Sequence, residues 1–518
     1  MAVKILTARE AANLVPNNVN FAINGFMGAS VPEEIAEEIE NRFLETGEPN
    51  NLTLLFCAAQ GDGKTKGLNH LAHEGLIRRA IGGHWGMAPK LGKLVVENKI
   101  IAYDFPQGVT NHMFRDTAAH KPGTISHVGL GTFVDPRYLG GKLNALTQKE
   151  EDLVKLIEID GKEYLYYKTH PVHFAILGGT YADENGNISI EREGVRAETL
   201  AVAQACKNSG GTVIVQVERV VKAGTLDPHK VEIPGVLVDA VVVISDPKYH
   251  MQNFGTQYNP GFSGEHRMGL AEFKPVPLNN KKIIARRAAM ELKKGSVVNL
   301  GIGIPEFISS VAMEEGINEF SLTVESGIFG GNPQSGLDFG VSLNPDAIIS
   351  MPSMFDFYQG GGLDQAFLGF AEADKEGNVN VSKFGSKLPG CGGFIDISQN
   401  SKQVFFCGTF TANGLKTEIK DGELHILHEG SVNKFRESVE HITFSVKTAI
   451  KNNLPVMYIT ERAVFRLTKD GIMLIEIAPG IDLEKDVLAH MPKKPIISPD
   501  LKRMDARIFK EEKMGLKQ

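Results

Sequence analysis

The chain has 518 residues, of which 42% are hydrophobic and 23% charged, and its formal net charge is -7. This composition is that of a folded globular protein, and the length exceeds what one ordinary domain core accommodates. The negative charge balance provides no positive field for a phosphate backbone, so the composition excludes a nucleic-acid partner.

The amino terminus and the cysteines predict the compartment. Lys4, Arg9 and Glu10 interrupt the first residues before a signal-like apolar core can form. No apolar run approaches the roughly 18 residues that a membrane-spanning helix needs. The cysteines, which show no paired metal-ligand spacing, are Cys57, Cys206, Cys391 and Cys407. We therefore expect a cytoplasmic protein with no metal site and no membrane contact.

The first strong pattern is a strand, a glycine turn and a helix start. It occupies residues 21–33 and ends in Pro32-Glu33, a pair typical of a helix N-terminus. The same order returns at Val297-Val298-Asn299-Leu300-Gly301-Ile302-Gly303-Ile304-Pro305-Glu306. Apolar residues at 307, 308, 311 and 312 then continue with helical spacing. Both segments are predicted to be strand-turn-helix units.

Further along the chain, predicted strands alternate with predicted helices. A strand at 52–56 precedes a segment 70–79 that we interpret as helical, and a strand at 213–217 precedes a turn at 223–225. His70 and His73 would then lie at i and i+3, where ordinary hydrogen bonding is favoured over zinc binding. The alternation implies crossover connections and a mostly parallel sheet.

A turn-and-strand motif also occurs twice. Its copies are Ala182-Asp183-Glu184-Asn185-Gly186-Asn187-Ile188-Ser189-Ile190 and Ala373-Asp374-Lys375-Glu376-Gly377-Asn378-Val379-Asn380-Val381. Each predicts a turn with glycine at positive φ. At nearly the same offset, Asn208-Ser209 and Asn400-Ser401 each precede an apolar strand. Three ordered matches predict two related domains.

The predicted fold is therefore α/β, with two tandem related domains, each an open, mostly parallel sheet flanked by helices. A polar, turn-rich stretch separates the halves. We place the domains at 1–250 and 280–518, with a linker at 251–279. The tail from about residue 484 is predicted to be poorly packed, because it is polar and carries Lys493-Lys494-Pro495.

One carboxylate stands at the end of an apolar run, in Val324-Glu325-Ser326-Gly327. The run at 320–324 is typical of a buried parallel strand, and α/β sheets bind ligands at the carboxyl ends of such strands. Glu325 is therefore a candidate nucleophile. The alternative is a glutamate that caps a following helix.

Two glycine loops resemble nucleotide-binding motifs but depart from them. Gly301-Ile302-Gly303 begins like a dinucleotide fingerprint, yet Glu306 replaces the last glycine. Residues 58–65 resemble a phosphate loop that has Ala58 where the first glycine is needed. The pairs Glu218-Arg219 and Glu461-Arg462 follow apolar strands and are candidate acid-base groups, although adjacent Glu-Arg pairs are commonly structural.

Together these motifs resemble a family I CoA-transferase of the fused single-chain type, which includes propionate and acetate CoA-transferases. The resemblance covers residues 5 to 515 and rests on the order of seven blocks: Asn24-Gly25-Phe26-Met27-Gly28, Pro106-Gln107-Gly108, residues 217–225, Asn299-Leu300-Gly301-Ile302-Gly303, Val324-Glu325-Ser326-Gly327, Gly390-Cys391-Gly392-Gly393-Phe394 and residues 476–482. It implies an alpha-like N-terminal half and a beta-like C-terminal half that carries Glu325.

The resemblance implies roles for individual residues. Glu325 matches the glutamate that forms a covalent thioester with CoA, and Gln107 matches the family's Pro-Gln-Gly glutamine. Gln107 and a backbone N–H of Gly392 or Gly393 would stabilise the oxyanion. The CoA-binding loop would be Gly301, Ile302, Gly303, Ile304 and Pro305. Lys383 either contacts the CoA phosphates or is a solvated surface residue.

The implied reaction transfers CoA from a short-chain acyl-CoA to a small carboxylate such as acetate or propionate. CoA would be a substrate and a transient covalent adduct, and no cofactor would be tightly bound. Ser326 follows the nucleophile where 3-oxoacid transferases carry Asn, which disfavours a 3-oxoacid substrate. The alternatives are an acyl-CoA hydrolase, a 3-oxoacid CoA-transferase and a non-catalytic CoA or nucleotide sensor. The resemblance also implies short-chain fatty acid metabolism, a homo-oligomer (dimer or tetramer) and a closed cleft between the two halves.

Overall fold

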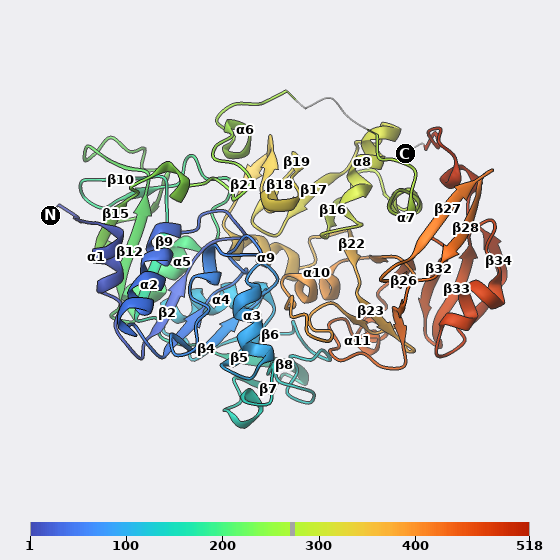
Figure 1. The fold of residues 1–518 in the computed structure, drawn as a ribbon, viewed down its shortest axis with the longest axis horizontal. Coiled ribbons are helices and arrows are strands. Elements are labelled where there is room, and N and C mark those ends of the chain that lie inside the picture. The colour runs from blue at the N-terminus through green and yellow to red at the C-terminus, as the bar shows by residue number, and fades with distance from the viewer. Residues whose placement is uncertain (1, 270–274, 517–518) are drawn as a thin grey trace. The chain divides into compact units, whose positions relative to one another are not determined.

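The computed structural model describes residues 2–269 and 275–516 and confirms the predicted α/β class (Figure 1). The chain forms two compact units. Unit 1 comprises Met1–Met268, Val324–Phe357 and Gly385–Asp396, and unit 2 comprises Gly269–Thr323, Tyr358–Phe384 and Ile397–Gln518. These units are defined by packing and differ from the duplicated halves, whose limits at 1–250 and 280–518 stay a prediction. Residues 270–274 of the expected linker lie outside the described residues.

An eight-stranded sheet forms the centre of unit 1. In spatial order its strands are β1 (Lys4–Leu6), β15 (Ala240–Val243), β12 (Thr212–Val217), β9 (Phe174–Gly178), β2 (Asn20–Ile23), β3 (Leu52–Leu55), β4 (Ile77–Gly82) and β5 (Ile101–Asp104). Every neighbouring pair is parallel. Continuous apolar runs such as β9 suit strands that are covered on both faces.

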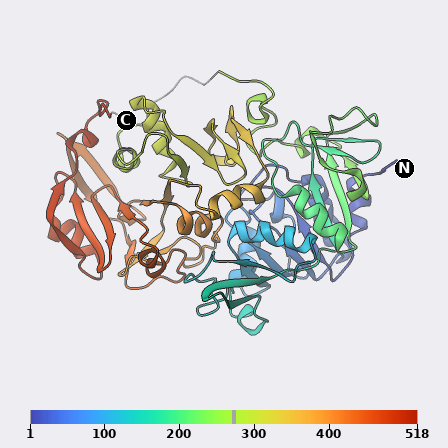
Figure 2. The same ribbon diagram turned by 180° about the vertical axis from the view of Figure 1, so that it is seen from behind.

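Helices cover both faces of this sheet. α1 (Ala8–Asn13) packs against α2 (Glu33–Thr46), and α4 (Gln107–Ala118) lies beside α5 (Thr199–Asn208) (Figure 2). α3 (Pro89–Val96) connects β4 to β5. Pro32 precedes the first residue of α2, as the sequence predicts.

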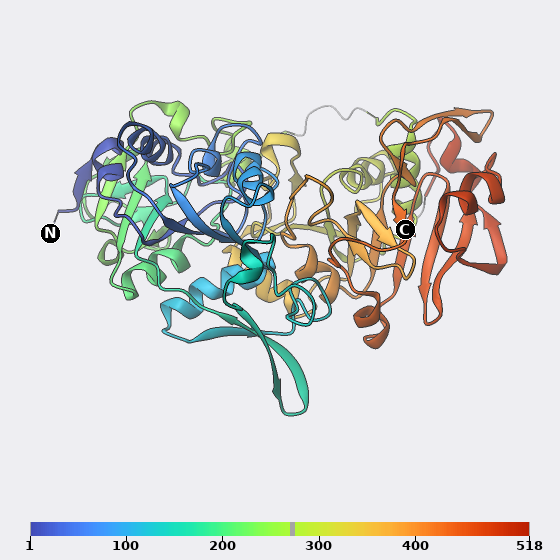
Figure 3. The same ribbon diagram turned by 60° about the horizontal axis from the view of Figure 1, so that its bottom comes forward.

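Smaller elements complete unit 1. β7 (Val154–Ile159) and β8 (Lys162–Lys168) form a long hairpin that pairs with β6 (Gly123–Ser126) (Figure 3). A second small sheet contains β13 (Arg219–Val221), β10 (Tyr181–Asp183), β11 (Ile188–Ser189) and β14 (Val231–Ile233). The segment Val324–Phe357 of unit 1 adds β18 (Ile328–Phe329), β19 (Asn332–Pro333), β20 (Ser342–Leu343), β21 (Ala347–Ile348) and the start of α9 (Met351–Gln359). The helix α6 (Pro260–Ser263) is a single turn.

Unit 2 has a second, mostly parallel sheet. Its strands follow the order β17 (Ser321–Val324), β16 (Val297–Leu300), β22 (Gln365–Gly369), β25 (Val404–Cys407), β31 (Val456–Ile459), β32 (Ala463–Thr468), β33 (Gly471–Ile477) and β34 (Ile496–Arg503). Only the pairs made by β32 are antiparallel in this series. The helices are α7 (Asn280–Ala289), α8 (Glu306–Glu315), α10 (Phe394–Asn400), which begins in unit 1, and α11 (Val446–Lys451).

The remaining strands of unit 2 are short. They are β23 (Glu372–Asp374), β24 (Val379–Asn380) and β30 (Phe435–Arg436) in one sheet, β26 (Thr411–Ala412) with β29 (Val432–Asn433), and β27 (Lys416–Lys420) with β28 (Glu423–His428).

The predicted repeat is confirmed in the strand order. The series β15-β12-β9-β2-β3 of unit 1 corresponds to β31-β25-β22-β16-β17 of unit 2. The repeated turns are also alike: the carboxylate of Asp183 accepts N–H groups of Asn185 and Asn187, and that of Asp374 accepts those of Gly377 and Asn378. The turn glycines, Gly186 and Gly377, have φ values of 85° and 100°.

Two sequence predictions are wrong. The segment 70–79 is not a helix: a turn follows the short 3₁₀ helix Gly67–Asn69, and β4 begins at Ile77. Gly75 at φ 93° interrupts the segment, and the carboxylate of Glu40 accepts a hydrogen bond from each of His70 and His73. These histidines therefore make the ordinary contacts that we favoured over zinc binding.

The tail is well packed, contrary to prediction. The fully buried guanidinium of Arg286 donates to the backbone carbonyls of Ile508, Lys510 and Glu512. β34 also extends the sheet along β33. Contacts with a residue more than 200 positions earlier in the sequence hold this end in place, and a local pattern cannot reveal them.

Candidate active site

The turn that carries Glu325 is tightly anchored in unit 1. Val324 and Ile328, on either side of the turn, belong to a buried apolar cluster with Ala29, Val195, Ala197, Phe262 and Val341. The Ser326 hydroxyl is buried and donates to the carbonyl of Gly340 at 2.6 Å. The Glu325 side chain is only half-buried. The turn therefore places one half-buried carboxylate between two buried anchors.

Gly327 has a steric reason to be glycine. Its φ is 115°, and a Cβ atom there would lie 2.1 Å from the carbonyl oxygen of Ile349. The backbone N–H of Ile349 donates to the carbonyl of Gly327 at 2.8 Å. Glu325 is followed by this turn and by β18, so the alternative of a helix-capping glutamate is excluded.

Gln107 begins α4, directly after the carboxyl end of β5, and is 2% exposed. Its side-chain Nε2 donates to the Met351 sulfur at 3.2 Å. A thioether is a weak acceptor, so this amide retains donor capacity. Met351 lies two residues after Ile349, which contacts the Glu325 turn. The segment 349–351 thus contacts both predicted catalytic elements within unit 1.

The glycine loop 390–393 is fixed against the ends of β4 and β5. The backbone N–H of Cys391 donates to Asp104 at 2.8 Å, and the Trp85 indole donates to the other oxygen of Asp104 at 3.2 Å. Trp85 and Gly86 both donate their backbone N–H to the carbonyl of Pro389. Burial raises the pKa of the Asp104 carboxyl well above its usual range.

The Gly392 amide is already engaged. Its N–H donates to the carbonyl of Gly83 at 2.6 Å, and its own carbonyl accepts the backbone N–H of Gln107 at 2.9 Å. Of the two predicted backbone donors, Gly392 is therefore committed to the scaffold. The N–H of Gly393 makes no hydrogen bond within the described part of the chain. The Gly392 carbonyl instead holds the backbone of Gln107, and an oxyanion role for the Gly393 N–H stays a prediction.

The predicted CoA loop lies in unit 2, between β16 and α8. Gly303 has φ 94°, and a Cβ atom on it would meet no atom within 4 Å, so its surroundings are open. Ile302 is 51% exposed, Gly301 donates its N–H to the carbonyl of Phe367, and Pro305 is the N-cap of α8. Ile304 lies in the turn between them. The exposed loop is compatible with a ligand, and its role stays a prediction.

Glu306 confirms why the loop differs from a dinucleotide site. Its carboxylate accepts the N–H of Gly303 at 2.9 Å, which places a negative charge where a pyrophosphate would bind. Lys383, also in unit 2, pairs with Glu440 at 2.8 Å and is about one fifth exposed. This ion pair supports the surface alternative for Lys383, and contact with CoA phosphates stays a prediction.

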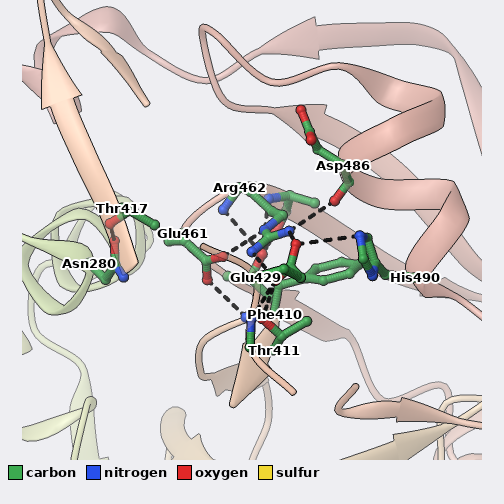
Figure 4. A network of polar contacts seen from close by, with 12 residues as sticks. Asn280, Phe410, Thr411, Thr417, Glu429, Glu461, Arg462, Asp486 and His490 are labelled. Atoms are coloured by element: carbon green, nitrogen blue, oxygen red, sulfur yellow. Dashed lines mark hydrogen bonds and ion pairs between the residues drawn. The ribbon is translucent and has the colours of Figure 1, made fainter. Parts of the chain in front are cut away.

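The Glu461-Arg462 pair has a structural role. Arg462 is fully buried and donates to Glu461 and Glu429 and to the carbonyl of Asp486 (Figure 4). Glu461 in turn accepts the N–H of Phe410 at 2.8 Å. Every side chain in this network has a protein partner. The other candidate, Glu218, pairs with Arg192 at 3.1 Å.

The described residues contain neither a cluster of three or more metal-binding side chains nor a helix long and apolar enough to cross a membrane. All four cysteines are free and buried. Burial raises the pKa of the Cys391 thiol well above its usual range, which disfavours a thiolate nucleophile.

Sequence reasoning missed three residues of the site. They are His84 after β4, Asp104 at the end of β5 and Met351 at the start of α9. The available signal was the position of His84 and Asp104 at strand ends, close to Gly83 and Pro106-Gln107-Gly108. Met351 gave no signal, because methionine in a helix is ordinarily a packing residue.

Comparisons with known proteins identify the family of this chain. A family model described as coenzyme A transferase matches residues 5–243. The acetate CoA-transferase YdiF of Escherichia coli K12 is 47% identical over 515 residues, covering 99% of this chain and 96% of the relative. The caffeate CoA-transferase of Acetobacterium woodii is 49% identical over 519 residues, covering 99% and 98%.

A solved structure is as similar to this chain as these sequence relatives are. The acyl-CoA transferase YdiF from Escherichia coli O157:H7, in a thioester complex with CoA, superposes with a TM-score of 0.93 at 47% identity, covering 99% of this chain and 98% of that one. Full-length identity of this size, together with the repeated α/β fold, shows that the chain is an enzyme of the coenzyme A transferase family.

Proposed function

We propose that the enzyme transfers CoA from a short-chain acyl-CoA to a small carboxylate by a ping-pong mechanism through Glu325. The observation that carries this proposal is the half-buried Glu325 carboxylate, held on a turn between buried anchors in the same compact unit as Gln107. A rigid turn of this kind keeps the nucleophile in one place, and the half-buried side chain retains some exposure through which a thioester could reach it.

The proposed first half-reaction has two steps. The Glu325 carboxylate attacks the thioester carbonyl, and CoA leaves as a thiolate, which gives a mixed acyl-glutamyl anhydride. The thiolate then attacks the glutamyl carbonyl and releases the first carboxylate, which leaves a glutamyl-CoA thioester. The acceptor acid reverses both steps with its own acyl group.

Stabilisation of the tetrahedral oxyanions is the main demand on the protein. A carboxylate is a weak nucleophile, and one oxyanion donor lowers the activation barrier by roughly 3 kcal/mol. Gln107 Nε2 is suited to this role, because its present acceptor is a thioether sulfur at 3.2 Å. The thioester complex with CoA described for the 47% identical YdiF supports a covalent CoA adduct here.

The proposed donors and acceptors are acetyl-CoA, propionyl-CoA and the corresponding acids. The relative named for acetate supports this range, and the one named for caffeate adds aromatic acids to the acceptors worth testing. An acceptor screen with acetyl-CoA as fixed donor distinguishes these acids from 3-oxoacids. Release of free CoA without any acceptor would instead indicate a hydrolase. A cytoplasmic location and a homo-oligomeric state also stay predictions.

The covalent step is tested by trapping. Incubation with acetyl-CoA followed by hydroxylamine should place a hydroxamate on Glu325, detected by peptide mass spectrometry. Glu325→Ala should lose nearly all transfer, a fall of roughly 10⁴-fold or more. Glu325→Asp should divert turnover toward hydrolysis, because its carboxylate is withdrawn by one methylene.

Glu423→Ala is the control variant, because Glu423 is an exposed glutamate of β28 outside the site. It should transfer CoA at the wild-type rate. Label on another residue, or full transfer by Glu325→Ala, would contradict the mechanism.

A further inference from the structure

His84 lies beside the predicted oxyanion donors of unit 1. A Cβ atom on Gly392 would lie 3.5 Å from His84 Cδ2 and 3.8 Å from Gln107 Oε1. The imidazole and the amide therefore flank the same glycine. On its other side, a Cβ atom on Gly86 would lie 3.1 Å from His84 Nε2. The His84 ring therefore lies between Gly86 and Gly392, which have no side chains to crowd it.

The backbone around His84 is rigid. Its carbonyl accepts the N–H of Ala59 at 3.1 Å, and the next two residues both donate to the carbonyl of Pro389. The segment follows β4, at the carboxyl edge of the sheet, where α/β proteins bind ligands. Main-chain contacts therefore hold the backbone that carries the ring, and the ring nitrogens take no part in them.

The two nitrogens of the His84 ring lack hydrogen-bond partners in the described part of the chain. Neither ring nitrogen makes a hydrogen bond within the residues that the structure describes, and Nδ1 is buried. His70 of the same unit shows the usual arrangement of a structural histidine, because Glu40 and Glu33 bind its two nitrogens at 2.5 and 3.1 Å. An unsatisfied buried polar group carries a free-energy cost, and a contact with a substrate is one way in which that cost is offset.

The ring is neutral at neutral pH. Burial lowers the pKa of His84 to about 4, and no neighbouring carboxylate opposes this shift. A neutral imidazole can donate a hydrogen bond to a carbonyl oxygen without transferring a proton to it, as neutral histidines do in other enzymes. In an acyl-transfer reaction this keeps the oxyanion charged and able to expel its leaving group.

We propose that His84 is a catalytic residue that donates a hydrogen bond from Nε2 to the carbonyl oxygen of the reacting acyl group, beside Gln107. Such a donor would take the place of the Gly392 N–H, which is committed to the carbonyl of Gly83. No bond is made or broken at the ring, and the proton stays on Nε2. This inference rests on the proposed transfer mechanism and assigns it a further side chain.

The experiment compares three variants of the full chain, with acetyl-CoA and propionate as substrates. His84→Ala should lower kcat about 100-fold, as expected for one oxyanion donor, with the KM for acetyl-CoA changed less than about threefold. His84→Gln, whose amide reaches the Nε2 position, should recover at least about tenfold of the lost rate. His84→Asn places its amide at the Nδ1 position and should recover none.

His170→Ala is the matched control. His170 also lies in unit 1, its pKa is also lowered to about 4 by burial, and its Nε2 is also buried without a partner. It lines instead a small cavity whose walls include Phe56, Met113 and Phe114 but neither Gln107 nor Gly392. The kcat of the His170→Ala variant, per folded protein, should stay within about threefold of wild type.

The rate of covalent CoA loading on Glu325 in a single turnover separates the two proposals. If His84→Ala loads CoA onto Glu325 as fast as the wild type, the role of His84 is overturned and the transfer mechanism stays intact. Equal recovery of kcat by His84→Asn and His84→Gln would have the same meaning. Absence of loading in the wild type would overturn both. If His84→Ala does not fold, the contrast between His84→Gln and His84→Asn still decides.

Discussion

Two polar clusters of this protein differ in how completely their hydrogen bonds are satisfied. In unit 2, Arg462 is enclosed by Glu429, Glu461 and the carbonyl of Asp486. In unit 1, the Gln107 amide donates to a thioether, and the His84 ring has no hydrogen-bond partner among the described residues. Saturated clusters hold a fold together, whereas unsaturated ones retain donors for a substrate.

The largest expected effect on stability is at the saturated cluster. Arg462→Met would leave the buried Glu461 carboxylate and Glu429 without their cation, a loss of about 3–5 kcal/mol. The apparent unfolding temperature should fall by several degrees, while kcat per folded protein should stay near wild type. Arg436→Met is the control, since that arginine is 46% exposed and pairs with Glu372 only at 3.9 Å.

The unsaturated cluster should behave in the opposite way. Gln107→Leu should lower kcat about 100-fold, roughly 3 kcal/mol of transition-state stabilisation, with little change in unfolding temperature. Gln216→Leu is the comparison, because the Gln216 amide bonds Glu34, Ile35 and Tyr249 in the same unit. That variant should lose stability and keep its kcat. A Gln107 variant that unfolds as readily as the Gln216 variant would remove the distinction.

The smallest expected effect is a dependence of stability on pH. Although burial opposes ionisation, hydrogen bonds from Arg462 and Thr411 lower the pKa of Glu429 from 4.5 to about 2. A lowered folded-state pKa gives stabilisation that is complete above the unfolded pKa and is lost as the pH falls toward the folded value.

The stability difference between wild type and Glu429→Gln, about 1–2 kcal/mol at neutral pH, should therefore shrink between about pH 5 and pH 2. Thermal melts across this range measure it. A difference that stays constant with pH would show that the charge of Glu429 adds nothing to the network.

Local chemistry explains what sequence analysis predicted. The repeated turns at Asp183 and Asp374 are set by Asp, Asn and Gly within five residues, and both form as predicted. The Pro-Glu helix starts at α2 and α8 are equally local. Glu325 was identifiable because a charged residue after a buried strand is conspicuous in the sequence itself.

Long-range contacts explain what the sequence analysis did not predict. Segment 70–79 has an apolar spacing that suits a helix, but two glutamates of α2 bind its histidines and β4 takes its second half. The place of His84 depends on Pro389, some 300 residues later in the chain. No local spacing reveals such a neighbour.

Unit 1 includes the segment Val324–Phe357, which follows the start of unit 2 in the sequence, and this order constrains how unit 1 folds during synthesis. The apolar surface formed by Ala29, Val195 and Phe262 is covered by Val324, Ile328 and Val341, which the ribosome adds only after it has begun unit 2. A fragment that stops at residue 268 would present this surface to solvent and would be prone to aggregate. The apolar core of unit 1 is thus complete only after synthesis past residue 341, and gene fragments designed from the duplication alone would divide this core.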